Sequence, residues 1–553
     1  AGGGGMGGMP RRRIDWGFPP SLDVAIRSFN VDAILKALQT ASDTELRVRF
    51  RDNVTLLHVL VCMLFTSKAG DISRTVSWPD PAVTVLRHSF IDALAQAIEP
   101  AFRLVLERAP ELANATDSKG HTVLHLITVV DAMPLVPLVI SVDRLGPQRQ
   151  NSAGTTPVNL AVKQGNHEMA EMMLDTLPSA QRETELAKIA TQSTLPGFPL
   201  QPGSIRNVPL RPPRSPLLEQ PPQEPPALCT EGGGWDVAPP PTEEERHSCQ
   251  FDQRTHLSAD EWYRDYYLLG RPVLIRGALS LRDRCAFAKR EPEMRAAERT
   301  AFECGRTAYP GLTGQKTCGK FTFGDLNKHP KCGDAQRTLP VCVTKPQGKD
   351  VNSSQIFRLL PTRYRWQDKI SPIETLEHSW VSGLTTQLFA GGDRSGAAAH
   401  FHAAAYNVLF FGVKEWMIQP VYYAAVSGGA SHGWASSMRG RFPSALPLRC
   451  TQGPGDLVLL PRLWGHSTIN RRYSFGIGDL FCDTETANIT QDPSCQNPLG
   501  LHMKRAALRS GMGRFVKESR GAGRVQATAA AAASLGLRAQ PGARGLASGS
   551  AAS

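Results

Sequence analysis

Two short stretches decide the fold of this chain: AHFH at residues 399–402 and PRLWGH at residues 461–466. Side chains alternate between the two faces of a β-strand, so histidines two residues apart project from the same face. His400 and His402 can therefore converge on one point, which His466 can reach from a second strand. Imidazole nitrogens are common ligands of divalent metal ions. The pattern predicts a metal site inside a β-barrel.

Further segments stand in a fixed order around these histidines. They are LSADEW at 257–262, GRPVLIRGA at 270–278, GVKEW at 412–416 and GPGDLVLLP at 453–461. Taken together, they resemble the JmjC branch of the 2-oxoglutarate oxygenases, and in particular the compact cupin-like protein hydroxylases. The resemblance implies an all-β double-stranded β-helix with flanking helices, with Fe(II) as the metal and 2-oxoglutarate as the co-substrate.

The predicted metal ligands depart from the family pattern at one position. The family binds iron with His-X-Asp or His-X-Glu plus a distal histidine, and here His402 stands at the carboxylate position. A third neutral imidazole still binds iron(II), but it removes a negative charge and alters the competition with zinc. We expect His400, His402 and His466 to be the ligands. Two alternatives stay open, a zinc-loaded site and a degenerate site in which His402 only lines the barrel.

The resemblance also implies a co-substrate site. Lys414 stands where the family places the base that pairs with the distal carboxylate of 2-oxoglutarate; a buried lysine is costly unless an anion accompanies it. The alternative places Lys414 on the solvent face of its strand. Asn407 and Asn470 match amide positions near the co-substrate, whereas Ala397 stands where relatives often carry a hydroxyl. No catalytic residue beyond the metal centre is predicted.

The N-terminal third carries a divergent repeat. TLLH at 55–58, TVLH at 122–125 and TPVN at 156–159 begin 67 and 34 residues apart. They resemble the Thr-Pro-Leu-His corner of ankyrin repeats, whose period is about 33 residues. The resemblance implies an α-helical ankyrin stack in which His58 and His125 brace the corners rather than take part in chemistry.

The composition predicts a multidomain chain. With 553 residues and 41% hydrophobic content, the chain can form two cores. Segments rich in glycine, proline or alanine cannot bury a core. The expected divisions are a disordered Gly/Arg-rich tail at 1–29, ankyrin repeats at 30–180, a Pro-rich linker at 181–245, the JmjC-like domain at 246–490 and a basic Ala/Gly-rich tail at 491–553. A linker of this length predicts that the two folded units move independently.

Charge and cysteine usage indicate which classes of partner and which cellular compartment to expect. The net charge is +12, but its excess gathers in the C-terminal tail without a recognition helix or zinc finger, which argues against nucleic acid as a partner. No apolar run predicts a transmembrane helix, and because the chain begins with Ala1 a leader could precede it. Eleven cysteines without a Cys-X-X-Cys pair fit a cytoplasmic or nuclear protein. Pairs such as Cys318 with Cys332, or Cys482 with Cys495, would require the secretory lumen instead.

Two functions follow from these patterns. The first is an Fe(II)/2-oxoglutarate-dependent protein hydroxylase, a dioxygenase whose ankyrin repeats recruit a protein substrate or partner. The second is a catalytically silent pseudo-oxygenase that serves as a protein-binding scaffold, which His402 and Ala397 favour. The substrate, the target side chain and the oligomeric state do not follow from the sequence.

Overall fold

A computed structural model provides the structure of the protein. It describes residues 18–28, 30–65, 72, 84–192, 242–244, 249–255, 262, 266, 270–279, 284–285, 301–305, 319–322, 341–344, 380–381, 387–429, 431, 447–480 and 482–483. The predicted C-terminal tail at 491–553 and most of the predicted linker at 181–245 lie outside these residues. No helix among them is both long and apolar enough to cross a membrane.

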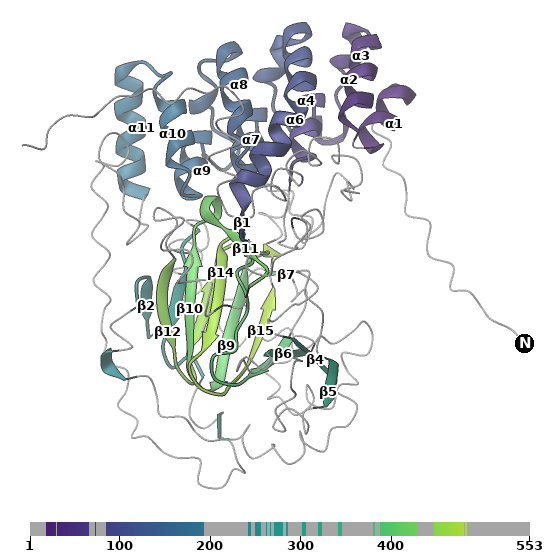
Figure 1. Ribbon diagram of the computed structural model, residues 1–553. Helices are drawn as coiled ribbons and strands as arrows, with labels where there is room; N and C mark the ends of the chain where they lie inside the picture. Colours follow the sequence, from purple (N-terminus) through teal and green to yellow (C-terminus); the bar gives the residue numbers. More distant parts are fainter. Residues whose placement is uncertain are drawn as a thin grey trace, which may run out of the picture.

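The N-terminal region is helical (Figure 1). Its helices are α1 (Pro20–Ser28), α2 (Val31–Thr40), α3 (Asp43–Leu46), α4 (Leu56–Cys62), α6 (Arg87–Arg108), α7 (Val123–Val130), α8 (Val136–Val142), α9 (Pro157–Lys163), α10 (His167–Leu174) and α11 (Ser179–Gln192). The region extends beyond both predicted limits, since α1 lies inside the predicted tail and α11 enters the predicted linker. Leu22 and Ile26, four residues apart on α1, are fully buried, so this segment has an apolar face. The glycine-rich composition of the residues before it led to its assignment to the tail.

The predicted Thr-X-X-His corners begin two of these helices. Thr55 and His58 form a reciprocal capping box at the start of α4, and Thr122 and His125 form another at the start of α7. The far nitrogen of each ring contacts a backbone carbonyl of a later loop, His58 Nε2 that of His121 at 3.0 Å and His125 Nε2 that of Thr155 at 3.1 Å. Each histidine thus satisfies a helix terminus and ties one corner to the next.

The C-terminal region is built from β-strands. Two larger sheets have the orders β2-β3-β13-β9-β15-β8-β6-β4-β5 and β12-β10-β14, and two pairs are β1-β11 and β7-β16. The strands are β2 (Asp252–Arg254), β3 (Val273–Ile275), β4 (Ala301–Gly305), β5 (Gly319–Thr322), β6 (Val341–Thr344), β7 (Trp380–Val381), β8 (Gln387–Gly391), β9 (Ala405–Phe411), β10 (Lys414–Gln419), β11 (Ala425–Ser427), β12 (Leu448–Gln452), β13 (Leu457–Leu460), β14 (Gly465–Asn470), β15 (Ser474–Leu480) and β16 (Cys482–Asp483).

The two larger sheets of this region pack against each other. Trp416 of the three-stranded sheet belongs to the same buried cluster as Leu274 and Val458 of the nine-stranded sheet. The Lys414 ammonium, from the smaller sheet, lies 3.5 Å from the centroid of the Phe389 ring on β8. The space between the sheets is therefore the interior in which the predicted site residues have to meet.

The helical and β regions are joined directly. Strand β1 (Thr84–Leu86), which leads into α6, pairs antiparallel with β11 of the β region. Backbone bonds reinforce the pair, because Arg87 N–H donates to Ala424 O at 2.8 Å and Tyr422 N–H donates to Gln164 O at 3.0 Å. One hydrophobic cluster runs through both regions. The expectation of two independently moving units is wrong, because the strand pair and the shared cluster hold the two regions together. The sequence did not reveal these contacts, since they join residues far apart along the chain.

Candidate metal centre

The two nearby histidines lie on an extended segment, residues 395–404, that precedes β9. His400 forms an isolated antiparallel bridge with His466 on β14, with backbone bonds of 3.0 and 2.8 Å in the two directions. Gly396 makes the close approach possible, because a Cβ there would overlap the carbonyl oxygen of Thr468. The backbone of His402 accepts a bond from Leu463 N–H at 2.8 Å. The two motifs that are distant in the sequence are thus held side by side.

The three imidazoles converge on one point. Their ligand atoms lie within 4.8 Å of one another. The ring centroids are 4.2 Å apart for His400 and His466, 4.5 Å for His402 and His466, and 5.2 Å for His400 and His402. His400 and His466 are buried, and His402 is partly exposed. Within the described residues no other group of His, Cys, Asp or Glu side chains has this geometry.

Backbone carbonyls orient all three rings in the same way. The Nδ1 atoms of His400, His402 and His466 lie 2.7, 2.7 and 3.0 Å from the carbonyl oxygens of Ala398, Ala403 and Trp464. A carbonyl only accepts, so each Nδ1 carries the proton and each Nε2 presents its lone pair.

The site also keeps the imidazole of His466 neutral. Burial, followed by the neighbouring His400 and His402 rings, holds the pKa of His466 well below its usual value. Neutral imidazoles with aligned Nε2 lone pairs are the donor set that a first-row divalent metal ion requires. The cluster could therefore hold a metal ion.

Lys414 lies inside the β region. In the register of the smaller sheet it stands opposite Gln452 on β12 and Asn470 on β14. Opposite residues share a face, and Asn470 shares the face of His466 because they are four residues apart on one strand. Trp416 links the two ends of this face, since its ring lies 6.0 Å from the His466 ring and 5.9 Å from the Lys414 ammonium.

The ammonium of Lys414 has an unusual environment. The side chain is 5% exposed, so the alternative of a solvent-facing lysine does not hold. Burial lowers its pKa to about 7. No carboxylate among the described residues pairs with it, whereas its neighbour Glu415 points to the opposite face and pairs with Arg449 and Arg471. A buried cation with aromatic neighbours and no described counter-ion is a place where an anion would be stabilised.

The two predicted amides differ in their surroundings. Asn470 is buried and donates through Nδ2 to the Ser395 hydroxyl at 2.9 Å. Its Oδ1, and the Oδ1 of the half-buried Asn407 on β9, have no hydrogen-bond partner among the described residues. Buried acceptors without partners are costly, so both amides could receive a hydrogen bond from a ligand.

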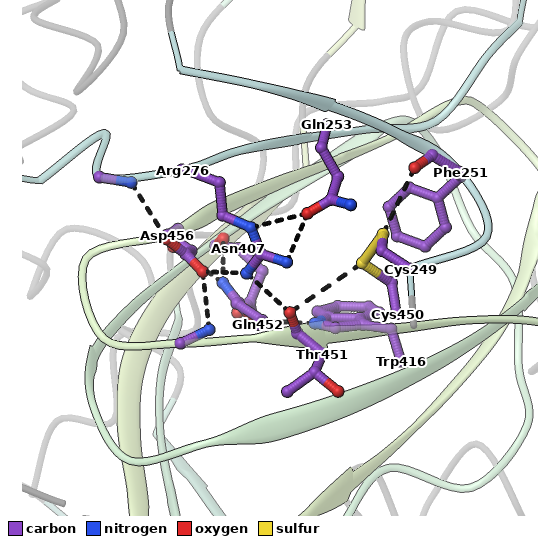
Figure 2. Close-up of polar contacts among 12 residues, drawn as sticks. Cys249, Phe251, Gln253, Arg276, Asn407, Trp416, Cys450, Thr451, Gln452 and Asp456 are labelled. Atoms are coloured by element: carbon purple, nitrogen blue, oxygen red, sulfur yellow. Dashed lines mark hydrogen bonds and ion pairs between the residues drawn. A yellow bond between two sulfur atoms is a disulfide. The ribbon is translucent and has the colours of Figure 1, made fainter. Parts of the chain in front are cut away.

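Residues that the sequence did not single out complete the walls. Figure 2 shows Gln452, whose Oε1 accepts from Trp416 Nε1 at 2.8 Å and whose Nε2 donates to the carbonyls of Asn407 and Asp456, both at 2.9 Å. Gln452 thus joins β10, which carries Lys414 and Trp416, to β9, which carries Asn407, by hydrogen bonds. It lies outside every recognisable motif, and only its strand register reveals its place.

A hydroxyl also stands near the position where the family motif leads one to expect it. Thr468 lies on β14 between His466 and Asn470, on the same face, and its Oγ1 accepts from Ala397 N–H at 3.0 Å. The hydroxyl of the facing strand thus binds the backbone of Ala397, two residues along β14 from His466.

A disulfide fastens the outer strand of this sheet. Cys249 is bonded to Cys450 on β12, across 201 residues of sequence, and Figure 2 shows it beside Trp416 and Phe251. This pairing was not predicted. The pairs considered from the sequence involve Cys318, Cys332 and Cys495, which lie outside the described residues.

Fold and site together define a β domain with a buried three-histidine cluster that could hold a metal ion, joined to a helical region. No family model matches the chain. The bifunctional arginine demethylase and lysyl-hydroxylase psr-1 of Caenorhabditis elegans is 29% identical over 119 residues, which are 18% of this chain and 30% of psr-1. Human JmjC domain-containing protein 8 is 22% identical over 243 residues, 43% of this chain and 86% of that protein. The chain is thus distantly related to JmjC-domain proteins over part of its length.

Proposed function

We propose that the chain is an Fe(II)/2-oxoglutarate-dependent dioxygenase that hydroxylates a protein side chain. The observation that carries the proposal is the pairing of a three-imidazole cluster, whose His466 ring burial keeps neutral, with a buried lysine that has no described counter-ion. His466 and Lys414 lie on one interior face. At one end of the proposed site the three imidazole ligands carry no negative charge, and at the other end the Lys414 ammonium is positive. A dianionic co-substrate that reaches from the metal to Lys414 would complement both ends.

Each residue of the site then has a definite task. The Nε2 atoms of His400, His402 and His466 hold the iron, and the Lys414 ammonium pairs with the far carboxylate of 2-oxoglutarate. Asn470 lies opposite Lys414 on the same face. Trp416 and the buried walls exclude water, so that the ion pair forms at low dielectric. Iron and 2-oxoglutarate, once bound, supply the oxidising chemistry, while the protein supplies orientation and a dry cavity.

We further propose that the helical region is a divergent ankyrin stack that recruits the protein substrate or another protein partner. The two reciprocal capping boxes, at Thr55–His58 and Thr122–His125, support this proposal. In each case the histidine bridges to the following loop, as a stacked repeat needs.

A catalytically silent scaffold remains the second candidate. It is favoured by His402, because a third imidazole leaves the ion without a charged ligand, and by Ala397. A zinc-loaded site is the further alternative, since three imidazoles also suit zinc. One substitution at His402 separates these functions.

The variant His402→Asp restores a carboxylate at the one ligand position that departs from the family pattern. Asp matches the reach of the imidazole only in part, but with His400 and His466 it restores the two-histidine, one-carboxylate ligand set typical of iron(II) oxygenases. If the fold is that of a working oxygenase, the variant should bind iron and release succinate from 2-oxoglutarate at least as fast as the parent. Metal analysis of anaerobically purified protein, together with a succinate assay, makes the measurement.

The outcomes of this comparison are distinct. Turnover in both proteins supports the enzyme, and turnover gained only in His402→Asp shows that His402 silences the parent. Iron and 2-oxoglutarate bound by both proteins without any succinate would overturn the hydroxylase proposal in favour of the scaffold. His402→Gln is the matched control, because it removes the imidazole without adding a charge.

The disulfide supports a proposal about location. Cys249 and Cys450 are bonded, and Cys285 is disulfide-bonded as well. Such bonds persist in oxidising compartments and are rare in the cytosol. We therefore propose the secretory lumen, rather than the cytoplasm or nucleus expected from the sequence. Peptide mapping of alkylated, unreduced native protein should recover Cys249 linked to Cys450. Recovery of both as alkylated thiols would contradict this.

A further inference from the structure

We propose that strand β1 of the helical region is a structural part of the metal centre, and that it positions the segment that carries His400. The inference rests on the proposed metal site. It assigns to the helical region a role beyond recruitment of a partner, because it makes the geometry of the three histidines depend on a strand encoded more than 300 residues earlier.

The segment that carries His400 is held between two strands. On one side β14 receives it, through Thr468 N–H to Ala397 O at 3.0 Å and through the paired bonds of His400 and His466. On the other side lies β11, whose Ser427 N–H donates to Ala399 O at 3.0 Å. The strand order in this part of the molecule is therefore β14, the histidine segment, β11 and β1.

Strand β11 depends on β1 for its remaining edge. β11 has three residues, and all three pair with β1: Ala425 with Leu86, Val426 with Val85 and Ser427 with Thr84. The Thr84 hydroxyl also donates to Ser427 Oγ at 3.3 Å, both groups being buried. A three-residue strand is marginal when it lies at an edge. Without β1, the strand that contacts the segment of His400 would be a three-residue edge strand.

Side chains couple the same elements. Leu86 of β1, Ala425 of β11 and Ala399, the residue before His400, belong to one small buried cluster with Met417 and Ile469. These five residues lie on the opposite side of the smaller sheet from His466 and Trp416. Through Ala399, the cluster therefore packs β1 and β11 against the segment that carries His400.

The start of α6 anchors β1 to the repeats. Arg87, which directly follows β1, forms an ion pair with Asp131 at the end of α7, and both side chains are fully buried. Gln164 Nε2 donates to the other oxygen of Asp131 at 2.9 Å, and the Gln164 carbonyl accepts from Tyr422 N–H, next to β11. A buried pair of this kind tolerates little displacement, since separation leaves an uncompensated charge. The repeats therefore hold β1 in one register.

The test uses the full-length chain and two variants of β1. Val85→Pro removes a backbone N–H from the middle of the three-residue strand. Thr84→Val, a change that conserves shape, removes only the hydroxyl bond to Ser427. Thr40→Val is the matched control, because the Thr40 hydroxyl also makes local bonds, to Lys36 and Ala37, but lies on α2 away from the junction. Circular dichroism establishes that each variant is folded.

Two readouts are combined. Hydrogen exchange of the metal-free proteins reports the amides of His400, His466 and Thr468, which should exchange faster in Val85→Pro, while those of β9 stay protected. Titration with Co²⁺, a spectroscopic probe for the site, should show affinity lowered by about tenfold or more in Val85→Pro, the range typical when support around metal ligands is lost. Thr84→Val should have a smaller effect of the same sign, and Thr40→Val none.

The results separate this inference from the function on which it rests. Unchanged exchange in a folded Val85→Pro variant, or faster exchange with unchanged Co²⁺ affinity, overturns the positioning role but leaves the metal site standing. A parent that binds no Co²⁺, Fe²⁺ or Zn²⁺ overturns the metal site and this inference together. Should Val85→Pro fail to fold, Thr84→Val and Ser427→Ala, compared singly and together, decide the question through the same exchange readout.

Discussion

A Lys414→Met variant should lose 2-oxoglutarate binding while it keeps its metal. Methionine preserves most of the length of the lysine stem but carries no charge, so a buried carboxylate would face Phe389 and Trp416 alone. Breaking one partner of a buried ion pair costs about 3–5 kcal/mol, and the Kd for 2-oxoglutarate should rise by at least about 100-fold. Calorimetric titration of anaerobic, Fe(II)-loaded protein measures this loss, and elemental analysis measures the metal.

The affinity of the parent for 2-oxoglutarate should also depend on pH. Burial lowers the pKa of Lys414 to about 7, so the ammonium is present below that pH and must be regained from solvent above it. Each pH unit above the pKa then costs about 1.4 kcal/mol, and the Kd should rise about tenfold between pH 7.5 and 8.5. Among the described residues no acidic side chain pairs with Lys414 to offset this effect. Lys414→Met should show no such dependence.

Lys36→Met is the matched control, since Lys36 lies exposed on α2 and the change removes the same charge. It should leave both the affinity and its pH dependence as in the parent. The anchor role of Lys414 is refuted if Lys414→Met binds 2-oxoglutarate as tightly as Lys36→Met does.

A His466→Ala variant should lose the metal itself. His466 supplies one of three nitrogens and its backbone bridges to His400, and the substitution removes the nitrogen while the backbone bonds remain. Loss of a direct ligand should weaken binding by more than about 100-fold, beyond the 10–100-fold typical of supporting residues. Metal at 100 times the Kd stabilises a protein by about 2.7 kcal/mol. The parent should therefore melt at a higher temperature with Fe²⁺ or Co²⁺ than without it, and the variant should not.

His167→Ala serves as the control for a lost histidine, because His167 lies at the start of α10, outside the cluster. It should keep the full metal-dependent shift in melting temperature. A shift that survives in His466→Ala would place the metal elsewhere and would sink the three-histidine site.

Local patterns determined part of the site. Two-residue spacing put His400 and His402 on one face of an extended segment, and the distal histidine was evident from the strand that leads to it. The structure brings the ligand nitrogens of the three rings within 4.8 Å of one another. Alternation along a strand is a local property, so it could be read without knowledge of any partner strand. The Thr-X-X-His corners were readable for the same reason, since a capping box closes within four residues.

Only the tertiary structure decided the rest. The direction of Lys414 depends on its register with Gln452 and Asn470, and strand alternation alone allows either face. The link between Cys249 and Cys450, and the pairing of β1 with β11, join residues about 200 and more than 300 positions apart. Which strands pair is set by the packing of the whole core, because hydrophobic burial is not directional and favours any partner of matching shape. The sequence by itself therefore determined which side chains could bind a metal, and long-range packing decided what surrounds, orients and supports them.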